Sequence, residues 1–142
     1  MNIKLLVEQL KKDEGYSEWS YADKDQHSWG YGTKAPGPNQ FINRQQADIE
    51  LWQRAALAIR DFYTLFQYAN TEIDEVRQLA LGNMCYNLGL TKIMKFRDML
   101  QAIQAGNWLE AAAQAQDSNW YKQVPHRAGR IVNEIRTGKK EA

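Results

Sequence analysis

Two acidic side chains, Glu14 and Asp23, are separated by eight residues and flank a change in the character of the sequence. Glu14 ends a periodic apolar segment, and Asp23 begins a turn-forming stretch at 23–26. Carboxylates at a helix end and at a turn can face one cleft. Cleavage of a glycosidic bond uses such a pair, because one carboxyl must hold a proton for the leaving oxygen while the other stays ionised. Taken alone, the pair is a weak signal, and solvated surface acids are the favoured alternative, since the chain holds 17 acidic residues.

Ser28 and Arg127 are two further polar candidates. Ser28 comes at the start of a predicted strand, where its hydroxyl could orient a water molecule or bond to the local backbone. Arg127 lies in the first turn of the predicted last helix, where a cation opposes the helix dipole. A carboxylate from elsewhere in the chain would compensate for that charge, and exposure at the surface is the alternative.

Other chemistries find little support in the residue types. His27, His126 and Cys85 lack the spacing of metal ligands, so we expect no metal site. Asp25, His27 and Ser28 are too close in sequence to form a nucleophilic triad, and no strained elbow motif surrounds the serine. No glycine-rich phosphate loop occurs, and we expect no cofactor.

The elements that must position these groups are helices and a small β-region. Apolar residues at 3, 6, 7 and 10 predict a helix that Gly15 ends. Residues 16–34 are rich in Tyr, Trp, Ser and Gly and predict a turn at 23–26 and a strand at 29–33. Residues 35–39 form a predicted loop. Part of the aromatic cluster in this region could face sugar rings; its members are Tyr16, Trp19, Tyr21, Trp29 and Tyr31.

Five helices are expected after residue 42. Their predicted caps or first residues are Asn43, Thr71, Thr91, Asn107 and Pro125. Glycines at 89, 106 and 138 mark the ends of the second, third and last helices. In the first of these helices we expect the aromatic stripe Trp52, Phe62 and Phe66 to be core. The fold class is therefore α+β, mostly helical.

Composition narrows the class of protein further. A length of 142 residues indicates one compact domain. The formal net charge of +1 argues against a dedicated nucleic-acid binder. No apolar run is long enough to span a membrane, and we expect no signal peptide because no basic segment precedes a long apolar one. The single cysteine suits a reducing compartment.

With these features in order, the sequence resembles the phage-type lysozymes, the T-even phage endolysin family (glycoside hydrolase family 24). Three stretches carry the likeness. The first runs from Asp13-Glu14-Gly15 to the Gly-x-Gly at 30–32, with eight residues between the Glu and the Asp as in the family. The others are residues 83–89 and residues 120–128, the latter reading WYKQVPHRA.

The resemblance implies a muramidase that cuts the β-1,4 bond between N-acetylmuramic acid and N-acetylglucosamine. It implies a lysozyme-like single domain over residues 1–142. The small β-hairpin lobe would cover about 14–42 and the larger helical lobe 1–13 plus 43–142, with the active-site cleft between them.

The resemblance also implies site roles. Glu14 matches the general acid, Asp23 the second carboxylate and Ser28 the family's threonine. Asp23 and Ser28 would hold a water molecule on the far side of the sugar, which implies a reaction that inverts the configuration at the anomeric carbon. Substrate-binding or supporting positions would be Arg127, Asn87, Gly30, Tyr21 and Gln123. Arg127 would pair with the catalytic Glu. A general acid needs a raised pKa, whereas a nearby cation lowers it, so burial of Glu14 would have to oppose the effect of Arg127 on its pKa.

The sequence departs from the family pattern in three places. Four residues separate Asp23 from Ser28, one fewer than usual, so Asp25 is a rival for the second carboxylate. Thr33 stands where the T-even enzymes carry a histidine, so a histidine ion pair is absent there. The stretch between Thr33 and Asn43 is also shorter, which implies a small β-lobe and a more open cleft.

The partners implied are peptidoglycan glycan strands, with no nucleic acid and no stable membrane insertion. The chain would be a monomeric endolysin, made in the host cytoplasm, that reaches the periplasm or cell wall through a lesion such as a phage holin provides and lyses the host. A virion-borne or prophage-encoded origin stays open. Three alternative functions stay open. The first is a lytic transglycosylase, which leaves a 1,6-anhydro product, and the second is an inactive wall-binding module that uses the basic stretch from Asn119. The least favoured is a helical nucleic-acid binder.

Overall fold

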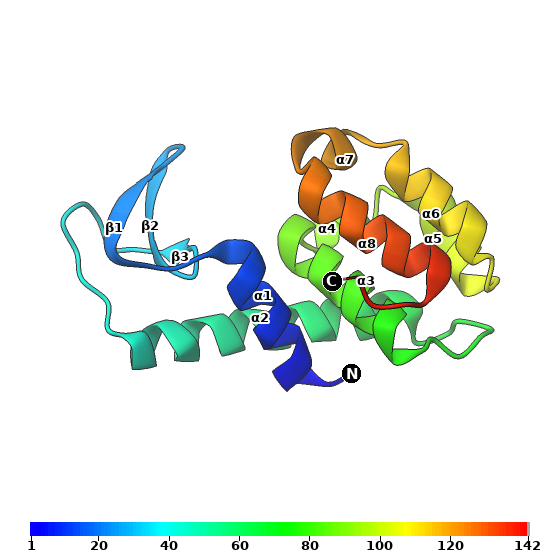
Figure 1. The fold of residues 1–142 in the computed structure, drawn as a ribbon, viewed down its shortest axis with the longest axis horizontal. Helices are drawn as coiled ribbons and strands as arrows, with labels where there is room; N and C mark the ends of the chain where they lie inside the picture. Colours follow the sequence, from blue (N-terminus) through cyan, green and yellow to red (C-terminus); the bar gives the residue numbers. More distant parts are fainter. Residues whose placement is uncertain (142) are drawn as a thin grey trace. The chain divides into compact units, whose positions relative to one another are not determined.

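The computed structural model describes residues 1–141 and confirms the α+β class, with helices dominant (Figure 1). The elements in chain order are α1 (Ile3–Glu14), β1 (Ser17–Asp23), β2 (Gln26–Gly30), β3 (Thr33–Lys34), α2 (Arg44–Phe66), α3 (Glu75–Leu88), α4 (Leu90–Ile93), α5 (Arg97–Gln104), α6 (Trp108–Gln116), α7 (Asn119–Gln123) and α8 (Pro125–Thr137). Two compact units emerge: an N-terminal unit, Ile3–Ala56, and a C-terminal unit, made of Met1–Asn2 and the chain from Leu57 onward. The expected single domain with lobe boundaries near 14 and 42 stays a prediction.

The sheet of the N-terminal unit is antiparallel, in the order β1-β2-β3. The predicted turn at 23–26 is confirmed as the hairpin between β1 and β2, where Asp23 pairs with Gln26. The predicted strand at 29–33 is wrong in its middle, because the chain turns between β2 and β3. Gly30 and Gly32 have φ values of 55° and 85°, a region that glycine enters at little cost, and the Gly32 amide donates to the Trp29 carbonyl at 2.9 Å.

The segment before α2 pairs with the other edge of β1 (Figure 1). The Ser20 amide donates to the Gln40 carbonyl at 2.8 Å, and the Ile42 amide donates to the Glu18 carbonyl at 2.9 Å. β1 is therefore hydrogen-bonded on both sides, which removes an open sheet edge.

Local signals at the ends of α1 and α2 are confirmed. Gly15, with φ 68°, follows the last residue of α1. The Asn43 side chain accepts from the Gln46 amide at 2.8 Å, as an N-cap does.

The buried stripe of α2 differs from the predicted one. Its buried residues are Ala47, Leu51, Ala55, Ala58, Phe62 and Phe66. Phe62 and Phe66 are core as predicted, with ring centroids 5.1 Å apart. The prediction for Trp52 is wrong, because its side chain is 38% exposed. One residue turns an α-helix by about 100°, so Trp52 leaves the face that Leu51 occupies.

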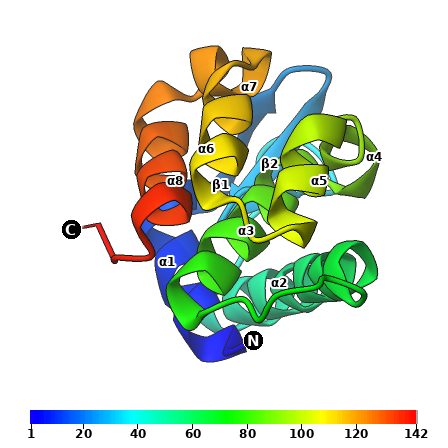
Figure 2. The ribbon, with the colours of Figure 1, turned by 90° about the vertical axis from the view of Figure 1, so that its right-hand side faces the viewer.

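The C-terminal unit is a helical bundle built around α3, which packs against α8, while α6 packs against both α8 and α5 (Figure 2). Every residue of α3 from Leu79 to Cys85 is buried. Ala80 and Met84 within it are fully buried, and the predicted stop at Gly89 is confirmed by a φ of 80°. Within residues 1–141 no helix has both the length and the apolar character that a membrane span requires.

Two predicted helix starts are wrong. Asp74 rather than Thr71 caps α3, because its carboxylate accepts from the Arg77 amide at 3.2 Å. The helix predicted from Thr91 is broken into α4 and α5. The break allows Ile93 and Met99 to be buried together; in one continuous helix they would point about 120° apart.

The remaining helix signals are confirmed. The Asn107 side chain caps α6 by accepting from the Glu110 amide at 3.2 Å. Pro125 is the first residue of α8, and Gly138 ends that helix with φ 68°. The short helix α7, capped by Ser118, was not predicted.

Arg77 of α3 holds the C-terminal end of α8. Its guanidinium donates to the carbonyls of Ile135 at 2.7 Å and Arg136 at 3.1 Å, and it pairs with Asp74 at 3.0 Å. It also lies over the Trp108 ring, 4.6 Å from the centroid. A cation at the end of a helix is favourable because it opposes the partial negative charge of the last carbonyls.

We expect Arg77→Ala to lower the free energy of unfolding by about 2–3 kcal/mol, because hydrogen bonds from a charged donor are lost and two carbonyls lose their partner. Urea denaturation followed by circular dichroism measures this. The matched control is Arg97→Ala, at an exposed arginine of the same unit, with a change within about 0.5 kcal/mol. Equal effects of the two substitutions would contradict the role given to Arg77.

Candidate active site

The N-terminal unit brings Asp23 and Ser28 into contact. Asp23 ends β1 and is half-buried, whereas Ser28 lies fully buried in β2. The Ser28 hydroxyl donates to Oδ2 of Asp23 at 2.8 Å. Ser28 pairs across the hairpin with Tyr21, two residues before Asp23, so the three side chains share a face of the sheet. Asp25, the rival candidate, lies exposed in the turn.

Tyr21 lies within electrostatic range of both candidate carboxylates. The pKa of its phenol is raised above the ordinary value of 10.0, first by burial, then by the charge of Asp23, and then by that of Glu14. Negative charges disfavour the tyrosinate anion, which explains the direction of the pKa shift. Glu14, the last residue of α1, and Asp23 therefore act on one phenol.

Two glycines of the β2–β3 region allow close approaches. A Cβ added to Gly32 would lie 3.4 Å from Oε2 of Glu14, so the backbone of the turn passes beside that carboxylate. A Cβ added to Gly30 would lie 3.1 Å from the Ala47 Cβ, so β2 packs tightly on α2. Gly30 thus supports the position of β2, which carries Ser28.

A cluster of cations and aromatic rings fixes the chain on both sides of Glu14. Lys11, one turn earlier in α1, pairs with Asp48 of α2 at 3.1 Å. Arg44 lies 3.8 Å from the Tyr16 ring centroid and donates to the Tyr31 hydroxyl at 3.3 Å, and the two tyrosine rings are 5.1 Å apart. The first turns of α2 therefore hold the segments before and after Glu14. No pattern in the sequence indicated Arg44 or Asp48 for this task.

Glu50 links α2 to the sheet. Its Oε1 accepts from the Trp29 indole at 3.0 Å and from the Thr33 hydroxyl at 2.5 Å. Thr33 is buried, and its neutral hydroxyl donates to this carboxylate. Glu50 follows Ala47 by three residues and so lies on nearly the same face of α2; that spacing is the signal that could have found it.

The other predicted site residues lie in the C-terminal unit. Nε of Arg127, in α8, donates to Oδ1 of Asn83 in α3 at 2.9 Å. Oδ1 of Asn87 accepts from the Trp120 indole at 2.8 Å, so this amide oxygen holds α7 to α3. Gln123, in α7, is exposed.

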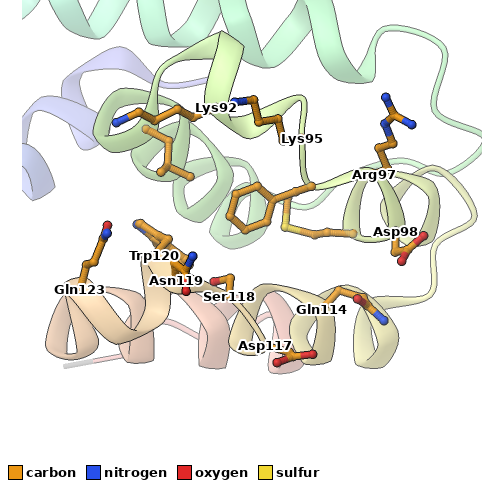
Figure 3. Close-up of a pocket in the computed structure, with 13 residues that line it drawn as sticks. Lys92, Lys95, Arg97, Asp98, Gln114, Asp117, Ser118, Asn119, Trp120 and Gln123 are labelled. Atoms are coloured by element: carbon orange, nitrogen blue, oxygen red, sulfur yellow. The ribbon is translucent and has the colours of Figure 1, made fainter.

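A pocket of about 490 Å³ opens in the C-terminal unit (Figure 3). Lys92 and Lys95 lie on one wall, and Ser118, Asn119 and Gln123 lie on the wall opposite. Phe96, Met99 and Trp120 contribute apolar surface, and further charged or polar side chains also line the pocket: Arg97, Asp98, Gln114 and Asp117. A lining that mixes polar, charged and apolar side chains suits an amphipathic ligand with hydrogen-bonding groups.

Thiol and metal chemistry have no support at these positions. Cys85 is buried, and burial, with a smaller contribution from the charge of Asp61, raises the pKa of its thiol to about 12. The thiol therefore stays protonated at neutral pH and is a poor nucleophile. Across residues 1–141, no three His, Cys, Asp or Glu side chains gather as metal ligands would.

Residues 11–138, which include every predicted site residue, match the phage lysozyme family. The chain belongs to this family. The matched stretch includes residues of both units.

The matches to curated relatives cover about half of the chain. Probable T4-type lysozymes 1 and 2 of Dictyostelium discoideum are 33% and 35% identical over 66 residues, which is 46% of this chain and 39% of each relative. The pre-baseplate central spike protein Gp5 of Enterobacteria phage T4 is 40% identical over 70 residues, or 49% of this chain and 12% of that protein. The matches thus span about two fifths or less of these relatives.

We expect removal of either carboxylate charge to lower the pKa of Tyr21. Asp23→Asn should have the larger effect and Glu14→Gln the smaller one, because Asp23 raises this pKa more than Glu14 does. Tyrosine Cζ chemical shifts followed by NMR between pH 8 and 12, with Tyr21→Phe for assignment, measure the change. Asp25→Asn is the matched control and should leave the pKa of Tyr21 unchanged. An equal shift from Asp25→Asn would contradict the interaction of Tyr21 with Asp23 and Glu14.

Proposed function

We propose that this phage lysozyme family chain is a muramidase, which hydrolyses the β-1,4 bond between N-acetylmuramic acid and N-acetylglucosamine in peptidoglycan. The observation that carries the proposal is the family match over residues 11–138, within which two carboxylates act on one tyrosine. The names of the Dictyostelium relatives, both probable T4-type lysozymes, agree with it.

Glu14 is the proposed general acid. It would donate its proton to the bridging oxygen as the bond from the anomeric carbon to that oxygen breaks, so the leaving sugar departs as an alcohol. Two features support the choice: Glu14 is half-buried, and its carboxylate lies against the backbone at Gly32.

Asp23 and Ser28 are the proposed holders of the attacking water. Oδ2 of Asp23 accepts from Ser28, and Oδ1 would accept a proton from a water that attacks the anomeric carbon from the opposite side, with inversion. The hydrogen bond supports Asp23 over Asp25. Serine lacks the methyl group of the family's threonine, but full burial and the bond to Asp23 restrict its rotamer.

The remaining residues have proposed supporting roles. Arg127 would act as a supporting cation, and Tyr21 would sit beside the reacting sugar. Asn87 would offer its amide nitrogen, since its oxygen is held by Trp120. Gln123 would contact substrate at the rim of the pocket in Figure 3, and Gly30 would keep β2 on α2.

We extend the proposal to the biological setting. The chain would act as a monomeric endolysin on glycan strands and cause host lysis. It would pass from the host cytoplasm to the wall through a membrane lesion such as one made by a holin.

Glu14→Gln should reduce the lysis of purified cell walls by about 10²–10⁴-fold, because the general acid is lost. Loss of turbidity measures the rate, and an unchanged thermal unfolding midpoint shows that the variant is folded. A variant that clears walls as fast as the parent would refute the assignment.

Mass spectrometry of the parent's products should show free reducing ends. Anhydro ends, one water lighter, would indicate a transglycosylase, and wall binding without released sugars would indicate a binding module.

Asp23→Asn and Asp25→Asn form a matched pair that tests the second carboxylate. Asp23→Asn should lower the lysis rate by about 10²-fold or more, whereas Asp25→Asn should change it less than about twofold. Ser28→Ala should fall between the parent and Glu14→Gln, since the carboxylate stays and only its orientation is lost. A larger loss from Asp25→Asn than from Asp23→Asn would reverse the assignment.

A further inference from the structure

The aromatic cluster at 16–31 divides into rings held inside the N-terminal unit and rings that face solvent. Tyr31 is buried, Tyr16 lies under Arg44, and the Trp29 indole is bonded to Glu50. Trp19 and Tyr21 are 55% and 41% exposed. Tyr21 belongs to the candidate active site, so Trp19 is the ring without an assigned task.

Trp19 forms an exposed pair with Phe41, which we call the aromatic platform. The ring centroids are 5.4 Å apart with an interplanar angle of 63°, and Phe41 is 53% exposed. The two residues face each other in a β-bridge, and hydrogen bonds Ser20–Gln40 and Ile42–Glu18 fix the backbone on either side. The backbone that carries both rings is therefore held in place before any ligand arrives, which lowers the entropy lost on binding.

We propose that the aromatic platform binds a sugar ring of an N-acetylated β-1,4-glycan at a position beyond the bond that is cut. This rests on the proposed function, since it assigns the platform to the same substrate. A pyranose ring presents C–H groups on its faces, and these pack on aromatic rings. Exposed neutral amides flank the platform at Asn39 and Gln40 and suit the hydroxyl and acetamido groups of a sugar.

The size of the platform favours a sugar over a protein partner. The two rings together expose on the order of 200 Å², given that each aromatic side chain offers about 150–250 Å² and half of it is covered. A stable protein–protein interface needs about 800 Å² per partner. A patch of this size matches one or two sugar rings.

Continuity with the candidate site favours the same ligand. β1 carries Trp19, Tyr21 and Asp23 at every second position. Trp19 and Asp23 are four residues apart, at most about 13 Å in an extended strand. An oligosaccharide of a few units can span that distance, so one glycan strand would reach from the reacting carboxylates to the platform.

The test uses the Glu14→Gln chain, which leaves the ligand uncut, titrated with tetra-N-acetylchitotetraose. NMR should show the Trp19 indole signal, assigned with Trp19→Phe, shifting with the same Kd as the site residues. Trp19→Ala and Phe41→Ala should each raise Kd about 3–10-fold, as expected for loss of one aromatic contact. In the Glu14 parent they should raise KM for walls and leave kcat unchanged. Trp19→Phe keeps a ring and should retain most of the affinity.

Tyr68→Ala is the matched control, because Tyr68 is a single aromatic residue, 84% exposed, in the C-terminal unit. A Trp19 signal that stays unmoved at saturation, or a Kd unchanged in both alanine variants, overturns the platform. Dimerisation in sedimentation experiments that Trp19→Ala abolishes would assign the patch to self-association and also overturn it. The two proposals fail in different ways. A Glu14→Gln chain that still lyses walls refutes the muramidase assignment. An inactive Glu14→Gln chain whose Trp19 indole signal does not shift refutes the platform alone.

Discussion

The small sheet keeps its geometry because the first turns of α2 hold it. A sheet of three strands, one of them only two residues long, has too little core to be stable by itself. Ala47 packs against Gly30, and Glu50 accepts hydrogen bonds from Trp29 and Thr33. Arg44 fixes the aromatic pair that follows α1. The positions of both candidate carboxylates depend on this attachment.

That attachment gives neighbouring acids different surroundings. Asp23 sits at the last position of a strand that is paired on both edges, and it meets a buried hydroxyl. Asp25 is two residues further on, but it lies in the exposed turn, where water solvates its charge. A shift of two residues in a hairpin thus separates an oriented carboxylate from a solvated one, which is a physical basis for choosing between them.

In the C-terminal unit, arginines serve as donors that tie α8 to α3. Arg77 donates to the last carbonyls of α8, and Arg127 donates to Asn83. Arg136 donates to Asn133, and Arg130 lies 3.9 Å from the buried Glu134. Two cations of the C-terminal stretch, Arg127 and Arg130, therefore have polar partners within the unit. This weakens the interpretation of that stretch as a surface for anionic envelope polymers.

Local signals determined much of the architecture. The caps at Asn43 and Asn107 and the left-handed stop at Gly138 were predictable, because each depends on groups three or four residues away. The resemblance to the phage-type lysozymes predicted Glu14, Asp23 and Ser28 as site residues, and the hairpin brings the last two into contact. Tertiary structure decided the rest. Whether Trp52 is core, and which residues of α2 hold the sheet, follow from packing between segments far apart in the chain. Spacing along the sequence carries no record of those contacts.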